Sequence, residues 1–123
     1  MAAFLFALMR TQTLDDTIRA GLEQFFRLHQ FLDAARQKPI PHESYYANAG
    51  YFYLFGHYYA ALCVDALPAS DRPEYQAHLA RTLLDLQEKD GSWWDYPFYD
   101  SHQPYGTAFA LMSLYRCRAE TAK

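Results

Sequence analysis

Hydrophobic and polar residues follow two helical patterns along the chain, and the two patterns occur twice in the same order. Residues 13–36 and 71–89 each carry apolar residues at spacings of three and four, which predicts an amphipathic helix with one side in water. Residues 47–67 and 104–117 are apolar nearly all round, which is typical of a helix buried on every side. No stretch alternates with period two, so the pattern predicts an all-α fold. The apolar stripes comprise Leu14, Ile18, Leu22, Phe25, His29 and Leu32 in the first amphipathic helix and Tyr75, Leu79, Leu83 and Leu86 in the second.

Capping residues mark the ends of the second amphipathic helix. Asp71 is expected at the N-cap, with Glu74 three residues later as a variant of the capping box and Pro73 tolerated in the first turn. Gly91 is expected to take the left-handed conformation that ends a helix. The helix is therefore predicted to run up to the Lys-Asp-Gly sequence at 89–91.

The first all-apolar segment contains small residues and one histidine. Gly50 and Gly56 each cost about 1 kcal/mol relative to alanine inside a helix, so we expect them to permit the close approach of another helix or of a ligand. His57 lies in the middle of the segment. A hydrogen-bonded core histidine is a commoner role at such a position than a catalytic or metal-binding one.

The two apolar segments match each other in register. Residues 55–62, FGHYYAAL, align with residues 105–112, YGTAFALM, and an amphipathic helix precedes each at a comparable distance. Residues 1–123 are therefore predicted to form one domain with a twofold repeat of about fifty residues. Each repeat is a hairpin of an outer amphipathic helix and an inner apolar helix, at about 13–67 and about 71–118.

Composition excludes several classes of protein. Hydrophobic residues make up 51% and aromatic residues 18% of the chain, which excludes disorder. Eleven Tyr and nine Phe suit dense packing between helices or an aromatic-lined groove. A net charge of -3 without a basic run argues against a nucleic-acid partner.

Membrane and redox signals are also weak. The N-terminal MAAFLFALMR is far shorter than the roughly 18 apolar residues that span a bilayer, so we expect a buried helical end and no membrane span. A chain that begins inside an apolar helix also raises the expectation of a piece of a longer protein. Cys63 and Cys117 lie in apolar helical contexts without metal or disulfide spacing, which favours a reducing, cytoplasmic compartment. No cofactor is expected.

The second repeat carries a more specific motif. Gln87, Asp90, Gly91 and Trp93 form the pattern QxxDGxW, and YGTAxALxxL follows from Tyr105. Together they resemble the QW-type repeat of the terpenoid cyclase and protein prenyltransferase superfamily. The resemblance covers the second repeat closely and the first only in its inner helix. It implies an α/α toroid, in which outer and inner helices alternate around a cavity, and two hairpins would form a segment of such an incomplete barrel.

Structural roles are sufficient to explain the motif residues, without a catalytic one. The glycine can stop the helix, the aspartate can cap neighbouring N–H groups, and the indole can close the end of the hairpin. The resemblance adds that Gln87 packs against Trp93 and bonds backbone at a helix end. Structural motif residues are therefore Gln87, Asp90, Gly91 and Trp93.

Catalytic signatures of that superfamily are missing. Squalene–hopene type cyclases carry DxDD, whereas the adjacent acids Asp15 and Asp16 lack the preceding aspartate. Prenyltransferases bind zinc through Asp, Cys and His, but Cys63 and Asp65 would point about 200° apart on one helix, so no metal site is expected.

The remaining candidates for chemistry lie in the loop before the last helix. Asp95, Asp100 and His102 could serve as acid or base, although a solvated, capping loop is the commoner role of such residues. His42 and Glu43 occupy the corresponding loop of the first repeat. Candidate ligand-binding residues are His57, Tyr58, Tyr96, Tyr99 and Tyr105.

Two functional hypotheses follow. The first is a non-catalytic α/α-toroid repeat segment that packs with further repeats of a longer chain or with another subunit, and that can present an aromatic-lined surface to an apolar or carbohydrate ligand. The alternative is a fragment of a cyclase- or prenyltransferase-like enzyme, or of a polysaccharide-active α/α toroid, whose catalytic residues lie outside this chain. Both predict an apolar face on the inner helices that needs a partner, and hence self-association of the isolated chain.

Overall fold

The structure is a computed structural model that describes residues 14–37, 49–96 and 101–118. Its described part is helical and contains no strand, which confirms the all-α prediction. The elements are α2 (Leu14–Arg27), α3 (His29–Arg36), the 3-10 turn η2 (Ala49–Phe52), α4 (Tyr53–Ala66), α5 (Arg72–Asp85) and α6 (His102–Cys117).

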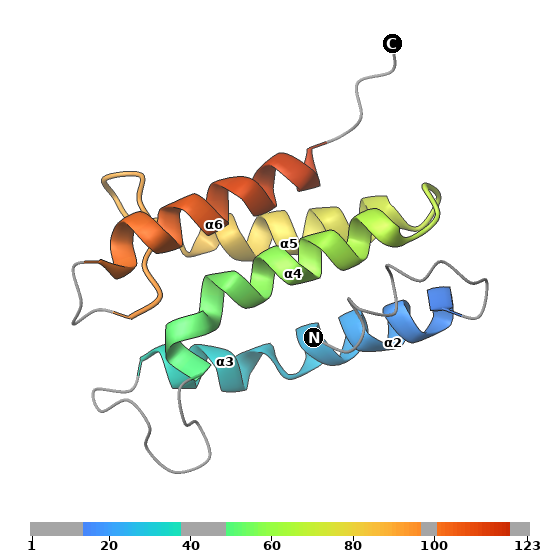
Figure 1. Ribbon diagram of the computed structural model, residues 1–123, viewed down its shortest axis with the longest axis horizontal. Helices are drawn as coiled ribbons and strands as arrows, with labels where there is room; N and C mark the ends of the chain where they lie inside the picture. The colour runs from blue at the N-terminus through green and yellow to red at the C-terminus, as the bar shows by residue number, and fades with distance from the viewer. Residues whose placement is uncertain (1–13, 38–48, 97–100, 119–123) are drawn as a thin grey trace.

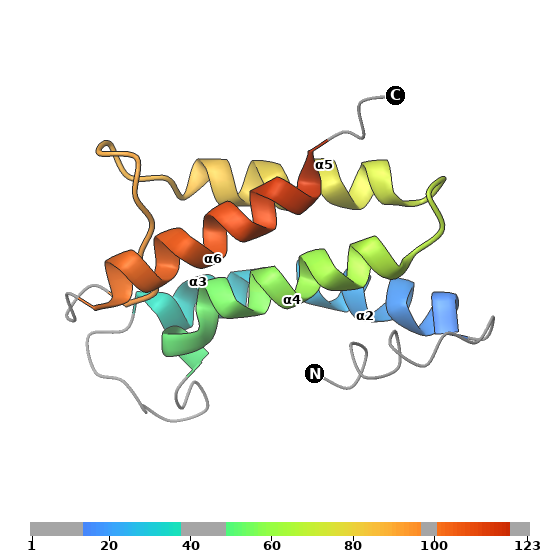
Figure 2. The same cartoon turned by 45° about the horizontal axis from the view of Figure 1, so that its top comes forward.

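Helix α4 is the central element of this bundle. It lies beside α6, contacts α5, and packs on its remaining side against α2 (Figures 1 and 2). Helix α5 also packs against α6, so each apolar inner helix contacts the amphipathic helix that precedes it in sequence. Along the chain, an amphipathic helix therefore precedes and contacts each apolar helix.

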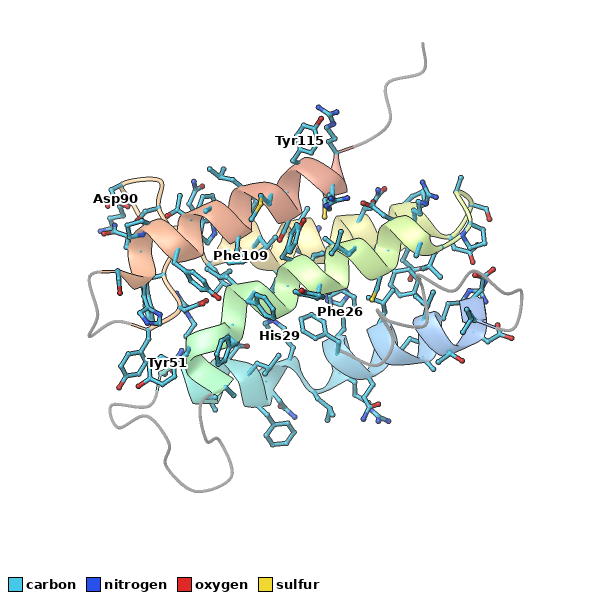
Figure 3. The ribbon with its side chains drawn as sticks, in the orientation of Figure 1. Phe26, His29, Tyr51, Asp90, Phe109 and Tyr115 are labelled. Carbon is cyan, nitrogen blue, oxygen red and sulfur yellow. The ribbon has the colours of Figure 1, made fainter. Side chains whose placement is uncertain are left out.

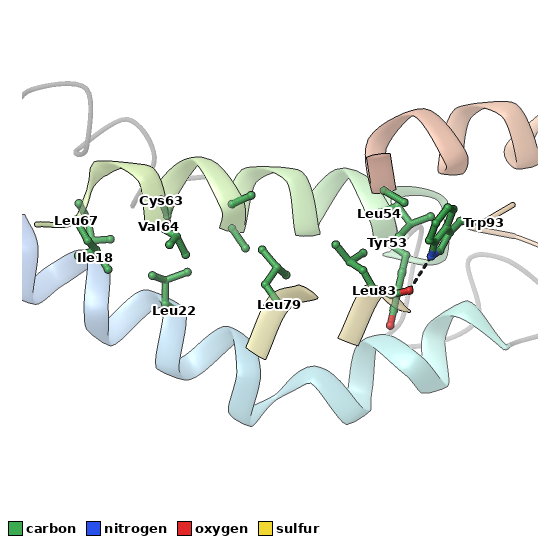
Figure 4. Close-up of a cluster of buried hydrophobic side chains, with 13 residues drawn as sticks. Ile18, Leu22, Tyr53, Leu54, Cys63, Val64, Leu67, Leu79, Leu83 and Trp93 are labelled. Carbon is green, nitrogen blue, oxygen red and sulfur yellow. Dashed lines mark hydrogen bonds between the residues drawn. The ribbon is translucent and has the colours of Figure 1, made fainter. Parts of the chain in front are cut away.

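The hydrophobic core lies where the stripes of the outer helices meet α4. Ile18 and Leu22 reach it from α2, Leu79 and Leu83 from α5, and none of the four side chains is more than 3% exposed (Figure 4). These residues belong to the stripes read from the sequence, because spacings of three and four place side chains on one face of a helix. Val64 of α4 is equally buried.

The first outer helix is broken, whereas the sequence predicted a continuous one. Leu28 separates α2 from α3 and has φ -95° and ψ 5°, in the region between helix and strand. The break leaves His29 at the first position of α3, from which its side chain points towards α4 (Figure 3). A local pattern of apolar residues cannot report such a break, since the stripe continues across it.

The predicted capping box at the start of α5 is wrong. Asp71 is the N-cap residue and proline lies in the first turn, but the Asp71 side chain caps no N–H group. Its carboxylate instead accepts hydrogen bonds from Arg19 Nε at 2.9 Å and Nη2 at 2.6 Å, and from Ser70 Oγ at 2.8 Å. Two charge-assisted hydrogen bonds from one guanidinium thus take up the carboxylate, and they hold the pKa of Asp71 below its usual value.

The two glycines of the first inner segment have different surroundings. A Cβ at Gly50 would lie 3.0 Å from the carbonyl oxygen of Ala35, so Gly50 does allow α3 to approach closely. A Cβ at Gly56 would meet no described residue within 4 Å. The expected close approach at Gly56 is therefore wrong for the described part of the chain. Helix α4 itself begins at Tyr53, after the 3-10 turn, and so later than predicted.

Candidate functional site

Residues of the QxxDGxW motif form a turn after α5, and its tryptophan anchors the following loop to that helix. Helix α5 ends at Asp85, well before Gly91, so the predicted role of Gly91 as the helix stop is wrong. Gly91 does have a left-handed φ of 85°, but in a following turn that its N–H closes onto Glu88 O at 2.9 Å. Gln87 Nε2 donates to Gly91 O at 3.0 Å and so ties the two sides of this turn together.

Asp90 and Trp93 hold the turn and the loop after it. Asp90 Oδ1 accepts from the backbone N–H of Ser92 at 3.0 Å and from its hydroxyl at 2.6 Å. The Trp93 indole is buried and donates from Nε1 to Leu83 O at 2.7 Å (Figure 4). The Trp93 N–H donates to Thr107 Oγ1 at 3.0 Å. Trp93 thus joins α5 to α6, through its indole on one side and its backbone N–H on the other. All four motif residues make structural contacts.

Asp95, a candidate acid, caps helix α4, which lies far from it in the sequence. Its side chain is fully buried, and Oδ1 accepts from the Leu54 N–H at 2.6 Å in the first turn of α4. Burial raises the pKa of Asp95 to about 7, against the opposing effects of this hydrogen bond and of nearby Arg36. Oδ2 has no hydrogen-bond partner among the described residues. The carboxylate therefore bonds α4 rather than His102.

His102 lies in an aromatic cluster at the same end of the bundle. Its ring centroid is 5.5 Å from that of Tyr51, 6.3 Å from that of Tyr96 and 6.0 Å from that of Tyr105. Burial lowers the pKa of His102. Asp100 and Tyr99, the other candidates in this loop, and His42 and Glu43 in the earlier loop lie outside the described residues.

Arg36 is a buried charge that sequence reasoning missed. Only 6% of it is exposed, its Nε donates to Trp94 O at 3.0 Å, and its guanidinium carbon lies 3.6 Å from the Trp94 ring centroid. Burial lowers its pKa. Arg36 therefore fastens the C-terminal end of α3 to the loop that also carries Asp95.

A polar cluster that the sequence analysis did not assemble lies between α3 and α4. His29 Nε2 is 2.8 Å from His57 Nε2, and His57 Nδ1 is 2.7 Å from the carbonyl oxygen of Tyr53. His29 Nδ1 is 3.1 Å from Asp33 Oδ2, and the Tyr53 hydroxyl donates to Asp33 Oδ1 at 2.5 Å. We call these four residues, His29, Asp33, Tyr53 and His57, the histidine cluster.

The contacts of the cluster fix where its protons lie. A carbonyl oxygen only accepts, so His57 carries its proton on Nδ1 and offers a lone pair at Nε2. His29 must then donate from Nε2. Its Nδ1 faces the carboxylate of Asp33. The neutral state of His57 agrees with its burial, which lowers its pKa to about 4.

In the histidine cluster, the side chains of Asp33 and His29 are 41% and 14% exposed, and His57 is fully buried. Both ring nitrogens of each histidine already have partners within the cluster, so it offers no free histidine nitrogen to a substrate. Among the described residues no group of three or more His, Cys, Asp or Glu side chains could hold a metal ion. His29 on the first apolar stripe and His57 in an apolar helix were the available signals, whereas nothing in the sequence paired them.

A face of aromatic and aliphatic side chains runs over α4 and α6. Phe109 of α6 lies against Phe55 and Tyr58 of α4, with ring centroids 5.5 and 5.6 Å apart, and against Tyr105 at 4.8 Å. Beyond this contact, α6 exposes Leu111, Met112 and Tyr115, at 54%, 40% and 62%. Tyr115 projects away from the bundle on the side of α6 opposite α4 (Figure 3).

The predicted ligand-binding residues therefore fall in three separate places. Tyr58 and Tyr105 belong to the aromatic face, His57 belongs to the histidine cluster, and Tyr96 is buried beside Tyr51. The rings of the aromatic face are partly exposed, whereas the exposed Leu111 and Tyr115 lie on another side of α6.

Comparison of the chain with protein-family models, with curated proteins and with solved structures gives no match. None of the helices in the described ranges is long and apolar enough to cross a membrane.

Proposed function

We propose that the chain is a non-catalytic segment of helical-hairpin repeats, of the α/α-toroid type, whose inner helices bind further hairpins. The support comes from the register of its two repeats. In that register each residue of α4 corresponds to the residue of α6 that lies fifty positions later, as Phe55 corresponds to Tyr105.

One stripe of α4 makes the contact with α6. Tyr58 lies 5.6 Å from Phe109 between ring centroids, and Asp65 accepts a hydrogen bond from Arg116. Ala61 lies between Tyr58 and Asp65 at spacings of three and four, and so on the same side of the helix. These α4 residues form the surface through which the first hairpin contacts the second.

The corresponding stripe of α6 is exposed, and this observation carries the proposal. The register equivalents of the three α4 residues are Ala108, Leu111 and Tyr115, and all three are exposed. In repeat proteins each unit contacts its neighbours through equivalent faces, and an end unit without a polar cap leaves its face open. We call Ala108, Leu111 and Tyr115 the α6 stripe. Its position in the repeat, its composition and its exposure suit it to bind the next hairpin.

Replacement of Leu111 by Glu tests this function. Leu111→Glu is expected to remove self-association and the binding of an apolar fluorescent dye, because a charge on this stripe opposes burial. The matched control is Leu84→Glu on α5, since Leu84 is 55% exposed and Leu111 is 54% exposed. The proposal fails if the wild-type chain binds no dye and stays monomeric in light scattering at high concentration, or if both variants behave alike.

A ligand-binding surface is the second candidate. It is favoured by the continuous ring contacts of Phe55, Tyr58, Tyr105 and Phe109, which suit an apolar chain or the flat face of a sugar. Displacement of the dye by an isoprenoid alcohol would indicate an apolar ligand, and displacement by an oligosaccharide would indicate a sugar. The enzyme alternative places the catalytic groups in repeats outside this sequence, and makes the same prediction for Leu111.

A further inference from the structure

The exposed side of α6 follows a heptad spacing along the whole helix. Steps of three and four residues alternate without interruption, which is the spacing of a seam that packs against one partner helix. We call these positions the α6 seam, and the α6 stripe is its central part. The seam comprises Ser101, Pro104, Ala108, Leu111, Tyr115 and Arg118, and all six are exposed. Gly106 and Ser113, on the opposite side of the helix, are buried in the bundle.

The composition of the seam differs from that of another exposed helix side. Helix α5 exposes Glu74, Ala77, Arg81 and Leu84 at the same spacing, and two of these four residues are charged. Between Ser101 and Tyr115, none of the exposed residues of α6 is charged. Depletion of charge is typical of the centre of a protein–protein interface.

We propose that the α6 seam binds the α6 seam of a second copy of this chain, antiparallel and about a twofold axis that passes between Ala108 and Leu111. This inference rests on the proposed function, because it uses the α6 stripe, and it names the partner. The contact uses the same surface on both copies, so it closes as a dimer.

The order of small and large residues along the seam favours the antiparallel arrangement. About this axis, Ala108 of one copy faces Leu111 of the other, and Pro104 faces Tyr115. Each bulky residue thus meets a smaller one, and each of these layers occurs twice in the dimer. A parallel pair would place Tyr115 against Tyr115 and Ala108 against Ala108, which crowds one layer and leaves a void in another.

Charges at the two ends of the seam favour the same arrangement. Arg118 lies at the C-terminal end, where its guanidinium carbon is 3.8 Å from the Tyr115 ring centroid. Asp90 lies at the N-terminal end, where its carboxylate accepts a hydrogen bond from Gln103 Nε2 at 3.1 Å (Figure 3). An antiparallel pair places the end with Arg118 beside the end with Asp90, whereas a parallel pair brings two Arg118 side chains together.

The seam spans only about two heptads, which is short for helices that must fold as they associate. Helix α6 is instead held in place within each copy, because it packs against both α4 and α5. Association therefore does not have to order the helix.

Sedimentation equilibrium tests the partner. The wild type is expected to show a monomer–dimer equilibrium. Leu111→Glu should weaken the dimer at least about tenfold, because each dimer would bury two of the new carboxylates. The control Leu84→Glu, on α5, should dimerise like the wild type. If Leu111→Glu is not helical by circular dichroism, Tyr115→Glu replaces it, since Tyr115 is 62% exposed.

Cysteine cross-linking tests the orientation. Cys117→Ser is the common background, which leaves the buried Cys63 as the remaining native thiol. Pro104→Cys and Tyr115→Cys are then made separately. The two positions lie roughly 16 Å apart along the helix, so an antiparallel dimer of either variant holds its two new thiols too far apart for a disulfide. An oxidised mixture of the two variants is expected to give a cross-linked heterodimer, and either variant alone is not.

Three results would overturn the antiparallel seam. One is cross-linking of the mixture that does not exceed that of each variant alone. Another is a Leu111→Glu variant that dimerises at wild-type strength, which would place the second copy on another surface. The third is wild-type assembly that grows beyond the dimer, because a twofold contact is closed.

The same experiments separate this inference from the proposed function. A monomeric wild type that still binds apolar dye, and loses it in Leu111→Glu, overturns the second copy as partner but keeps the α6 stripe as a surface for other hairpins. A monomeric wild type without dye binding overturns both.

Discussion

His29 and His57 are hydrogen-bonded through their Nε2 atoms, 2.8 Å apart, and this contact joins α3 to α4. The bond requires a lone pair on His57, whose other ring nitrogen donates to the carbonyl of Tyr53. A protonated His57 would have no lone pair for His29. The neutral state of a buried side chain therefore contributes to the junction of an outer and an inner helix.

Stability that depends on a neutral His57 should decrease in acid. Its pKa is lowered from 6.5 to about 4 in the folded chain, so below pH 6.5 the unfolded chain takes up a proton that the folded chain refuses. The free energy of unfolding then falls as the pH falls from 6.5 to 4, by at most about 3 kcal/mol. In urea unfolding, the advantage of the wild type over His57→Gln should shrink by up to that amount between pH 7 and pH 4.

The exposed His78 provides the control for this measurement. The effect of substitution should change more between pH 7 and pH 4 for His57→Gln than for His78→Gln, because His57 is buried and His78 is exposed. An advantage over His57→Gln that is the same at pH 7 and pH 4 would mean that His57 is not held neutral by its burial.

Much of the fold could be predicted from local pattern, because spacings of three and four specify a helix and its buried side. Leu79 and Leu83 were assigned to a core stripe in this way and are completely buried. Helix ends were predicted less well. Asp71 has the sequence context of a capping residue, but Arg19, distant in sequence, takes its carboxylate. Competition between local and distant partners is invisible in a linear pattern.

The candidate site was predicted least well, for a related reason. Asp95 was chosen as an acid in a loop, and its carboxylate is instead the cap of a helix that lies far from it in sequence. The sequence placed His29 on the stripe of the first helix and His57 in an apolar helix, but their pairing depends on the break at Leu28 and on the packing of α3 against the start of α4. Only tertiary structure brings them together.

Asp95→Asn should stabilise the chain at neutral and alkaline pH. The pKa of Asp95 is raised from 3.8 to about 7, so the folded chain holds a proton that the unfolded chain releases, and stability decreases as the pH rises from 4 to 7. An asparagine keeps an acceptor for the Leu54 N–H without the charge. Relative to wild type, its free energy of unfolding should increase by at most about 4 kcal/mol between pH 4 and pH 8.

Asp95→Ala distinguishes the charge from the hydrogen bond. It removes the acceptor of the Leu54 N–H and should destabilise the chain by roughly 1–3 kcal/mol relative to Asp95→Asn at every pH. Equal stability of the two variants in denaturant titrations would show that the side chain at 95 does not cap α4.

Trp93 should be a major contributor to stability. Trp93→Ala leaves a cavity at the junction of α5 and α6 and removes the bond to Leu83 O, so a loss of roughly 3 kcal/mol is expected in chemical unfolding. Trp93→Phe keeps most of the ring and should lose about 1 kcal/mol for the missing N–H donor. A loss within about 0.5 kcal/mol for the alanine variant would contradict the role of the indole as an anchor.

Gly56 and Gly106 are a matched pair in which the same substitution should have opposite effects. Gly106→Ala places a methyl group within 3.0 Å of Leu54, Trp93 and Trp94 atoms, two of which are backbone. Such overpacking costs about 1–3 kcal/mol. Gly56→Ala meets no described residue and gains up to about 1 kcal/mol of helix propensity. Thermal and urea unfolding at concentrations where the chain is monomeric should rank Gly56→Ala at or above wild type, and Gly106→Ala below it. If both substitutions destabilise the chain equally, Gly56 has a close neighbour in the folded chain, as Gly106 does.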